Sequence, residues 1–372
     1  MQVGVPKEIK NHEYRVGLTP ASVREVVAHG HGVFIETRAG AGIGASDDDY
    51  RKAGAAVLAS AQEVFASADM IVKVKEPQAQ ERQRLRPGQV LFTYLHLAPD
   101  PEQTRDLIKS GATCIAYETV TAASGGLPLL APMSEVAGRM SIQAAAHCLE
   151  REAGGMGVLL GGVPGVNPVK VVILGGGVVG ANAALMAVGL GAEVVVIDRS
   201  VEVLRALVRQ FGTRIRTLAS NAATIETEVT TAAVVIGGVL IPGAAAPKLV
   251  SREMLKAMQP GAVVVDVAID QGGCFETARA TTHAAPTYVE EGVVHYCVAN
   301  MPGAVPRTST YALNNATLPF VLALADKGWR LALADDPHLS KGLNVFEGKV
   351  TCAGVAEALG YAYVDPRTVL AA

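Results

Sequence analysis

The chain of 372 residues is poor in aromatic side chains and carries no excess of positive charge. Phe, Tyr and Trp make up 5% of the residues, with a single Trp, and the formal net charge is -3. No cluster of Lys and Arg reaches the length of a basic tail. The electrostatic footprint of a nucleic-acid-binding protein is therefore missing, and we expect no nucleic-acid partner.

Cysteine motifs, metal signatures and targeting signals are missing as well. The five cysteines are scattered and none forms a C-x-x-C pair, as expected for reduced, mostly buried thiols of a cytoplasmic protein. The histidines show no zinc-binding spacing, so no metal is predicted. The N-terminus has no basic segment followed by an apolar core, which predicts no secretory signal.

One uncharged run requires a choice between a membrane span and a buried core segment. Residues 171–192 contain no charged side chain, a length that can cross a bilayer. Three consecutive glycines interrupt the run, and a second apolar strand ending in an acid follows it. The flanks lack an aromatic belt and a cluster of positive charges. A buried strand, turn and helix is favoured, and no membrane contact is expected.

Length and periodicity predict an α/β protein with two domains. The chain is longer than one hydrophobic core usually serves, half of its residues are apolar, and strand-like runs alternate with helix-like segments. We expect two doubly wound, Rossmann-like domains with parallel sheets and a cleft between them. Residues 1–130 and 306–372 form one discontinuous domain, whose tail is predicted as helical, and residues 131–305 form the other.

The strongest local motif is VVILGGGVVG in the second domain. Gly175, Gly177 and Gly180 satisfy G-x-G-x-x-G between an apolar strand and a helix. Such glycines permit a tight turn, a close approach of backbone to pyrophosphate, and close helix–strand packing. The next strand ends in Asp198, where a carboxylate is expected to meet the adenosine ribose. The second domain is therefore predicted to bind a dinucleotide.

The acidic residue favours NAD over NADP as that dinucleotide. Asp198 repels a 2′-phosphate, but Arg199 follows it directly, and an arginine at this place can accommodate a 2′-phosphate. The alternative for Arg199 is a solvated surface charge. NAD is the predicted cofactor, with NADP less favoured.

Polar side chains follow several predicted strands. They are Arg15, Lys75, His96 and Glu118 in the first domain and Asp270 and Asn300 in the second. Ligands of open α/β sheets bind outside the carboxyl ends of strands. A guanidinium with an ammonium suits a substrate carboxylate. An imidazole suits general acid/base catalysis, and Asp270 is a second candidate for it.

These residues also have structural interpretations. A histidine at a strand end is more often structural than catalytic. Lys73 and Lys75 alternate with apolar residues, so one of them could be the exposed face of an edge strand.

Taken together, the segments resemble the bacterial alanine dehydrogenase family. The resemblance rests on VGVPKEIKNHEYRVGLTP, KVKEP, YLHLAPD, VVILGGGVVG, VDVAIDQGGCFE and NMPGAVPRTSTYALNNATLPF, which span Val3 to Phe320. It implies reversible oxidative deamination of L-alanine to pyruvate and ammonium with NAD, in a cytoplasmic homohexamer.

The resemblance also implies roles for individual residues. Arg15 and Lys75 hold the substrate carboxylate and carbonyl, and His96 and Asp270 are the acid/base groups. On this basis residues 1–130 and 306–372 are the substrate domain. The residues implied in cofactor binding, besides the three motif glycines, are Ser134, Val178, Asp198, Ser220, Val239, Leu240, Val267, Asp270, Arg279, Val298, Asn300 and Met301.

One position departs from the family pattern, and other functions remain as alternatives. Family members often carry a basic residue five positions after the ribose-binding aspartate, where this chain has Val203, with Arg199 and Arg205 nearby. The main alternative is the NAD(H)-binding unit of proton-translocating transhydrogenase, without amino-acid turnover. YLHLAP and AIDQGG favour the dehydrogenase. A saccharopine-type reductase and a catalytically idle NAD-binding scaffold are further alternatives.

Overall fold

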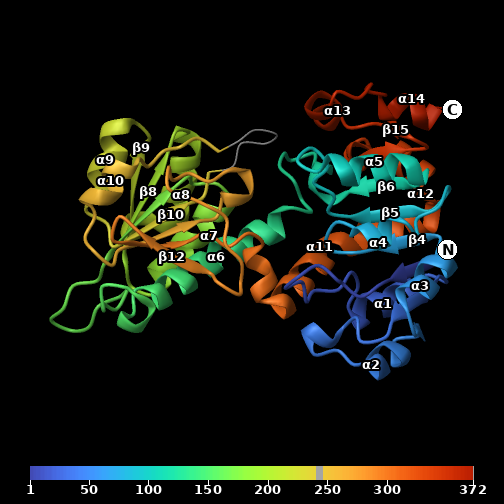
Figure 1. Cartoon of the computed structure of the whole chain (residues 1–372), viewed down its shortest axis with the longest axis horizontal. Helices are drawn as coiled ribbons and strands as arrows, with labels where there is room; N and C mark the ends of the chain where they lie inside the picture. The colour runs from blue at the N-terminus through green and yellow to red at the C-terminus, as the bar shows by residue number, and fades with distance from the viewer. Residues whose placement is uncertain (240–245, 372) are drawn as a thin grey trace. The chain divides into compact units, whose positions relative to one another are not determined.

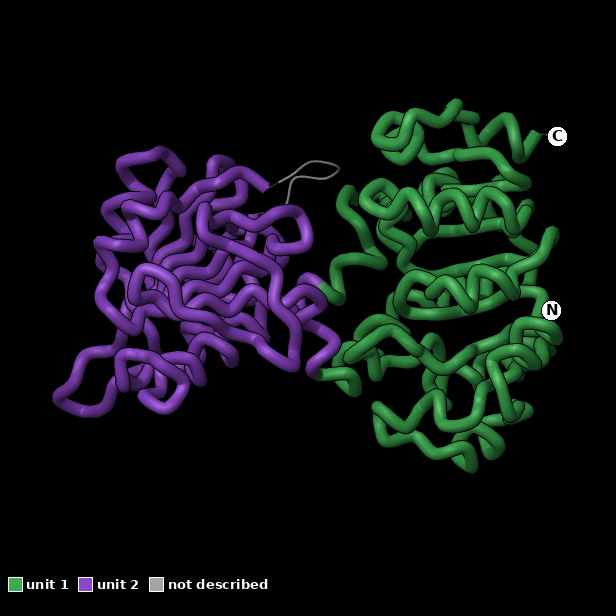
Figure 2. Tube along the Cα trace, in the orientation of Figure 1, with its two compact units in different colours: residues 1–133, 305–372 green, residues 134–304 purple. Residues whose placement is uncertain are grey.

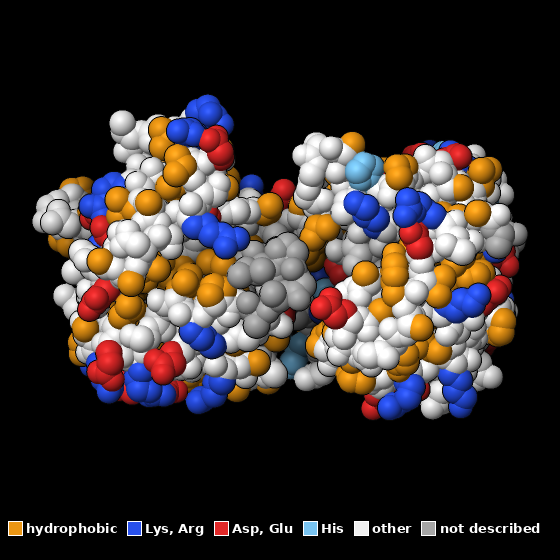
Figure 3. Space-filling model, turned by 90° about the horizontal axis from the view of Figure 1, so that it is seen from above, with side chains coloured by type: hydrophobic (Ala, Val, Ile, Leu, Met, Phe, Trp, Pro, Cys, Tyr) orange, Lys and Arg blue, Asp and Glu red, His pale blue; other side chains and the backbone are white. Residues whose placement is uncertain are grey.

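The chain divides into two compact units, each with its own sheet. The computed structural model describes residues 1–239 and 246–371. Unit 1 comprises Met1–Met133 and Val305–Ala372, and unit 2 comprises Ser134–Ala304 (Figure 2). In the view of Figure 3, acidic and basic side chains are interspersed on both units, and neither sign forms a continuous field.

Unit 1 is built on an eight-stranded sheet in the order β15-β14-β6-β5-β4-β1-β2-β3 (Figure 1). Strands β1–β6 run parallel, whereas β14 pairs antiparallel with both β6 and β15. The strands are β1 Gln2–Val5, β2 Gly32–Glu36, β3 Ala56–Leu58, β4 Met70–Val72, β5 Val90–Thr93, β6 Thr113–Ala116, β14 Leu343–Phe346 and β15 Lys349–Val350.

The helices of unit 1 lie between these strands and in the C-terminal tail. They are α1 Pro20–Ala28, α2 Asp47–Lys52, α3 Ala61–Ser67, α4 Ala79–Arg82, α5 Pro101–Ser110, α11 Pro306–Lys327, α12 Trp329–Asp335, α13 Ala353–Leu359 and α14 Pro366–Ala371. Helix α1 begins as its sequence predicts: the Thr19 hydroxyl accepts from Ser22 N, and Pro20 occupies the first turn.

Unit 2 is built on a seven-stranded sheet in the order β12-β13-β11-β10-β7-β8-β9. All neighbours pair in parallel except the outer strand β12, which is antiparallel to β13. The strands are β7 Lys170–Leu174, β8 Glu193–Asp198, β9 Ile215–Ala219, β10 Val234–Gly237, β11 Val263–Asp266, β12 Thr287–Glu290 and β13 Val293–Tyr296. The helices are α6 Ala131–Cys148, which starts in unit 1, α7 Val178–Gly189, α8 Val201–Phe211, α9 Ala222–Thr230 and α10 Arg252–Ala257.

The core of unit 2 has two halves, one on each face of the sheet. Along β7, Val171 and Ile173 belong to one apolar cluster, while Val172 and Leu174 belong to the other. Successive strand side chains point to opposite faces, so both faces are covered. This is why the strands read as continuous apolar runs, as parallel sheets buried on both sides do.

Both units share one strand order, and the predicted fold class is confirmed. In unit 1 it is β3-β2-β1-β4-β5-β6, and in unit 2 it is β9-β8-β7-β10-β11-β13. This is the doubly wound Rossmann order, in which the chain direction across the sheet reverses between the first and fourth strands. The ligand crevice of such sheets lies outside the strand ends at that reversal.

The prediction of a purely helical tail after Val305 is wrong. Besides its helices, the tail adds the strands β14 and β15 to the sheet of unit 1. Their hairpin turns at Glu347-Gly348, where both residues have positive φ, 43° and 80°. The unpredicted hairpin of β12 and β13 turns in the same way at Glu291-Gly292, with φ 53° and 75°. Two positive φ values define the tight hairpin turn that Asn-Gly favours. Glu-Gly is a weaker signal, so the sequence did not reveal it.

The uncharged run 171–192 forms most of β7, the glycine turn and α7. Most of its apolar side chains pack in the core of unit 2, whereas Val178, Leu185 and Leu190 are exposed. Within the described part of the chain, every helix is too short or too polar to traverse a bilayer.

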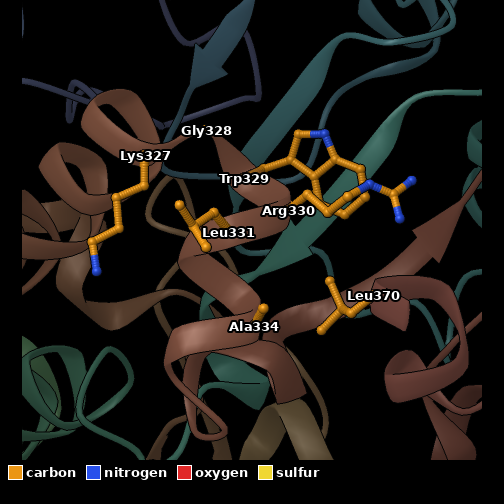
Figure 4. A pocket seen from close by; sticks show the side chains of 7 residues that line it. All are labelled: Lys327, Gly328, Trp329, Arg330, Leu331, Ala334 and Leu370. Atoms are coloured by element: carbon orange, nitrogen blue, oxygen red, sulfur yellow. The ribbon is translucent and has the colours of Figure 1, made fainter. Parts of the chain in front are cut away.

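A shallow surface pocket of about 430 Å³ lies where α11 ends and α12 begins (Figure 4). Arg330 lies over the Trp329 ring, with its guanidinium carbon 4.9 Å from the ring centre. The lining consists of Lys327, Gly328, Trp329, Arg330, Leu331, Ala334 and Leu370. None of the predicted site residues within 1–239 and 246–371 lines this pocket.

We expect Gly180→Ala to destabilise unit 2, because helix α7 touches β7 at this residue. A Cβ at Gly180 would lie 1.8 Å from the Gly175 carbonyl oxygen. Relieving that overlap should lower the free energy of unfolding by about 1–3 kcal/mol. Gly189→Ala in the same helix is the control, since its Cβ would meet nothing within 4 Å. Urea titrations giving equal stabilities for the two variants would contradict the close approach.

Candidate active site

Four predicted polar residues lie on one edge of the sheet of unit 1. Arg15 follows β1, Lys75 follows β4, His96 follows β5 and Glu118 follows β6. These strands are parallel neighbours in the order β6-β5-β4-β1, so their carboxyl ends meet at the same edge. Arg15 and Lys75 flank the reversal between β1 and β4, where ligands of doubly wound sheets bind.

Arg15 is a buried cation held by a neighbouring acid. Its Nε and Nη2 donate to the two oxygens of Glu13 at 2.7 and 2.5 Å, and its Nη1 lies 3.0 Å from Met133 Sδ. Burial lowers the pKa of Arg15, but the hydrogen bonds and charge of Glu13 outweigh burial and raise that pKa overall. A planar fork held on one side by a carboxylate has a fixed orientation.

Lys73 is not the exposed face of an edge strand, so that alternative is wrong for this residue. Strand β4 is central and ends at Val72, and Lys73 is 0% exposed. Its Nζ lies 2.9 Å from Glu8 Oε2 and 2.8 Å from Glu81 Oε1. A buried ammonium between two buried carboxylates is a structural ion cluster.

Lys75 has its backbone fixed and its side chain partly exposed. Glu8 Oε1 accepts from Val74 N at 2.7 Å and more weakly from Lys75 N at 3.4 Å. Thr93 Oγ1 donates to the Lys75 carbonyl at 3.0 Å. The ammonium lies 3.9 Å from Glu76, which also pairs with Lys10. Lys75 is thus anchored through its main chain, which leaves the side chain able to reorient.

His96 lies in the loop after β5 with a left-handed backbone, φ 50°. Glu118 accepts from His96 N at 2.6 Å and from Leu95 N at 3.2 Å, and its Oε1 lies 3.9 Å from the ring Nδ1. The imidazole stacks on Tyr94 with 5.7 Å between ring centres, and 44% of its side chain is exposed. A non-glycine residue in this conformation carries strain, which is typical of functional sites.

The glycine turn of unit 2 has the geometry of a phosphate cradle. Gly175 has φ 93°, and a Cβ there would lie 3.1 Å from the side chain of Val239. By contrast, a Cβ at Gly177 would meet nothing within 4 Å. Packing therefore does not require a glycine at Gly177, whereas approach of a pyrophosphate does. Helix α7 begins at Val178, so its unpaired N–H groups face this open space.

Asp198 ends β8 and braces the same turn. Its Oδ2 accepts from Gly176 N and its Oδ1 from Ser200 N, both at 2.7 Å. Ser220 N donates to the Asp198 carbonyl at 3.0 Å. A carboxylate has about four acceptor sites, so two remain for ribose hydroxyls.

Further residues of the predicted cofactor set lie on segments near the carboxyl ends of the strands of unit 2 or near the start of α7. Ser134 is one helical turn before Gly138, where a Cβ would lie 2.2 Å from the Val179 carbonyl oxygen, so this part of α6 runs close to the start of α7. Asn300 has φ 65°, and Met301 is buried in the core. Asp270 is exposed in the 3-10 helix η5 Ile269–Gln271, after β11.

Arg279, one of the predicted cofactor residues, is not brought to the glycine turn. Arg279 lies over the Tyr288 ring of β12, 3.7 Å from its centre, and pairs with Glu290. Three strands separate β12 from β7 in the sheet. Leu240 lies outside the described residues.

The residues around the glycine turn of unit 2 fit a dinucleotide. The open glycine position, the twelve-residue helix that follows it and the carboxylate with spare acceptor sites are the three elements that such a ligand requires. Over residues 1–239 and 246–371, no group of three or more His, Cys, Asp or Glu side chains is placed to hold a metal ion.

Comparison with known proteins identifies the family. Residues 4–137 match the N-terminal domain model, and residues 141–353 the C-terminal domain model, of alanine dehydrogenase/PNT. The chain is 60% identical over 370 residues to an alanine dehydrogenase of Halomonas elongata, covering all of both chains. The chain belongs to the alanine dehydrogenase family. Membership of this family and the Rossmann-like unit imply a nicotinamide cofactor and small-molecule substrates.

Solved structures agree with this assignment. An L-alanine dehydrogenase superimposes with a TM-score of 0.94 at 56% identity, covering 97% of this chain and 99% of the other. A transhydrogenase from Sinorhizobium meliloti superimposes with a TM-score of 0.81 at 27% identity, covering 95% and 99%. The transhydrogenase alternative is therefore the more distant of the two.

The sequence did not identify the acids that hold these loops. Glu8 and Glu13 precede Arg15 in the loop after β1, and Asp266 ends β11. A signal was present for Asp266, because it interrupts the apolar run AVVVDVA, and a carboxylate buried in a strand must find donors. Nothing in the spacing of Glu8 and Glu13 indicates which cation each one meets.

We expect Lys73→Met and Lys75→Met to differ sharply in stability. Removing the buried ammonium of Lys73 leaves Glu8 and Glu81 without a counter-charge, which should cost about 3–5 kcal/mol of unfolding free energy. Among the described residues, the Lys75 ammonium makes only a long ion pair, so Lys75→Met should cost less than about 1 kcal/mol. Guanidinium unfolding curves measure both. Similar losses would mean that Lys73 is not the structural lysine.

Proposed function

We propose that the protein catalyses the reversible, NAD-dependent oxidative deamination of L-alanine to pyruvate and ammonium. The observation that carries the proposal is the presence of Arg15, Lys75 and His96 on the loops of parallel strands at one sheet edge. The relatives named alanine dehydrogenase support the choice of substrate. Unit 1 is then the substrate domain and unit 2 the NAD-binding domain.

The two cations of unit 1 suit the acid end of the substrate. Arg15 is oriented by Glu13, so its guanidinium offers a fixed fork to a carboxylate. Lys75 offers a mobile point charge to the carboxylate or the keto oxygen. Together they fix the position of the substrate Cα, which is the orientation contribution to catalysis.

His96 and Asp270 suit the proton transfers. The cofactor, when bound, accepts the hydride from the alanine Cα. Water then adds to the iminium carbon of the substrate, and the carbinolamine loses ammonia as its hydroxyl proton leaves. An imidazole is suited to moving such protons near neutral pH. Glu118 Oε1 lies 3.9 Å from the ring Nδ1 of His96.

NAD is the proposed form of the cofactor, and the assembly proposed is a homohexamer. Asp198 supports NAD, since its remaining acceptor sites suit ribose hydroxyls and its charge opposes a 2′-phosphate. The hexamer follows from the resemblance to the family, and light scattering of the purified chain tests it. The proposed location is the cytoplasm.

Initial rates with alanine, serine and glycine, each with NAD and with NADP, test the function. We expect alanine with NAD to be the fastest pair. Intact NADH binding without alanine-dependent NAD reduction would favour the NAD(H)-binding unit of a transhydrogenase or an idle scaffold instead.

We expect His96→Ala to lower kcat by at least about 100-fold, because a general acid/base contributes that much or more. NADH affinity, measured by fluorescence titration, should stay within a few-fold. His147→Ala is the matched control, since His147 is exposed on α6 and pairs only locally with Glu150. Comparable loss of NADH binding in His96→Ala would show that the histidine is structural.

We expect Asp198→Ala to weaken NAD binding roughly tenfold or more, because charge-assisted hydrogen bonds are lost. The affinity for NADP should fall less, so the ratio of NAD affinity to NADP affinity should decrease in the variant. Glu193→Ala is the control, because Glu193 is an exposed acid at the other end of β8. Unchanged NAD affinity in Asp198→Ala would contradict the ribose assignment.

A further inference from the structure

Asp266 is a buried carboxylate that the proposed chemistry does not use. It is the last residue of β11 and is 0% exposed. Asp270 follows it on η5, in a loop that returns to the body of unit 2 at Cys274 and Phe275. Burying a carboxylate lowers the stability of the fold unless the group is hydrogen-bonded. The hydrogen bonds of Asp266 therefore indicate what it does.

The carboxylate of Asp266 closes this loop at both ends. Oδ1 accepts from Ala268 N at 3.1 Å, at the start of the loop. Oδ2 accepts from Cys274 N at 2.8 Å and weakly from Phe275 N at 3.5 Å, at its end. The exposed Asp270 lies between these two attachment points. The carboxylate thus acts as a clasp on the segment that carries the second acid/base candidate.

The loop is shaped to fit this clasp. Gly273 has φ 77°, and a Cβ there would lie 2.4 Å from Asp266 Oδ2, so only glycine lets the returning chain close on the carboxylate. On the outer side, Lys248 Nζ donates to the carbonyls of Gly272 at 2.5 Å and Phe275 at 2.9 Å. The return of the loop is therefore held from two sides.

Burial has a measurable electrostatic consequence at this position. It raises the pKa of Asp266 to about 6, against the opposing effects of the backbone donors and Lys248. The other titratable groups around it are the thiols of Cys274 and Cys297. Because the folded-state pKa is raised, the cost of the charge is fully present above about pH 6 and disappears as the pH falls through the usual carboxyl range.

We propose that Asp266 is a positioning residue, whose ionised carboxylate holds the loop 267–275 so that Asp270 is presented in one geometry. The inference rests on the proposed role of Asp270, but the clasp can be tested without it. Preorganisation of this kind lowers the cost of ordering a catalytic group in each turnover.

The near-isosteric variant Asp266→Asn separates charge and acceptors from shape. An amide has one acceptor oxygen, so its NH₂ must face either Ala268 N or the pair Cys274 N and Phe275 N. Whichever way it turns, donor meets donor at one end of the loop. The variant keeps the packing and opens the clasp.

We expect amide hydrogen exchange of residues 268–275 to quicken about tenfold in Asp266→Asn. With alanine and NAD, kcat should fall roughly tenfold to 100-fold, as for other residues that position a catalytic group. The KM for alanine should stay within about threefold, because Arg15 and Lys75 lie in the other unit. Lys248→Met should show the same changes to a smaller degree, and it covers the case in which Asp266→Asn does not fold.

The control is Glu228→Gln. Glu228 is a buried acid of the same unit, and it forms ion pairs with Lys170 and Arg216, whereas Asp266 accepts hydrogen bonds from a loop backbone. It should lower the melting temperature but leave kcat and exchange at 268–275 unchanged.

Unchanged exchange in folded Asp266→Asn, or in Lys248→Met if the former does not fold, would overturn the clasp. Faster exchange with wild-type kcat would also overturn the proposal. A wild-type chain inactive on alanine would refute the proposed function, while the exchange measurement still decides the clasp.

Discussion

The candidate substrate site of unit 1 and the candidate cofactor site of unit 2 each depend on carboxylates that accept hydrogen bonds from main-chain N–H groups at the carboxyl edge of the sheet. Glu8 holds the backbone of Lys75, Glu118 that of His96, and Asp198 the glycine turn. A loop has few backbone partners of its own, and a fixed acceptor with several lone pairs supplies them. The backbone that carries the polar side chains of these candidate sites is therefore held in place by hydrogen bonds.

Two buried acids of unit 1 pair with cations, and these pairs link stability to the proposed function. Lys73 neutralises Glu8, and Arg15 neutralises Glu13. The first pair is sealed in the core, whereas the second belongs to the predicted substrate site. Removing one partner of a buried pair leaves an uncompensated charge. Lys73 thus stabilises the fold, whereas Arg15 is proposed to bind the substrate.

The architecture was largely predictable because both sheets are mostly parallel and their central strands are buried. Continuous apolar runs, the G-x-G-x-x-G turn and the acid at Asp198 follow directly from that arrangement. Strands outside it were not predicted: β12, β14 and β15 are antiparallel additions, and their hairpins turn at Glu-Gly pairs. Lys73 was ambiguous because alternation alone does not distinguish a central strand from an edge strand.

The family resemblance, the doubly wound fold class and the residues at several strand ends could be read from the amino-acid sequence, since local periodicity and motif spacing carry that information. Which acid meets which N–H group became visible in the folded chain alone. Glu118 is 22 residues from His96, and Glu8 is 65 residues from Lys73. Contacts of this range depend on the order in which strands pair, and a sequence pattern does not specify that order for individual side chains.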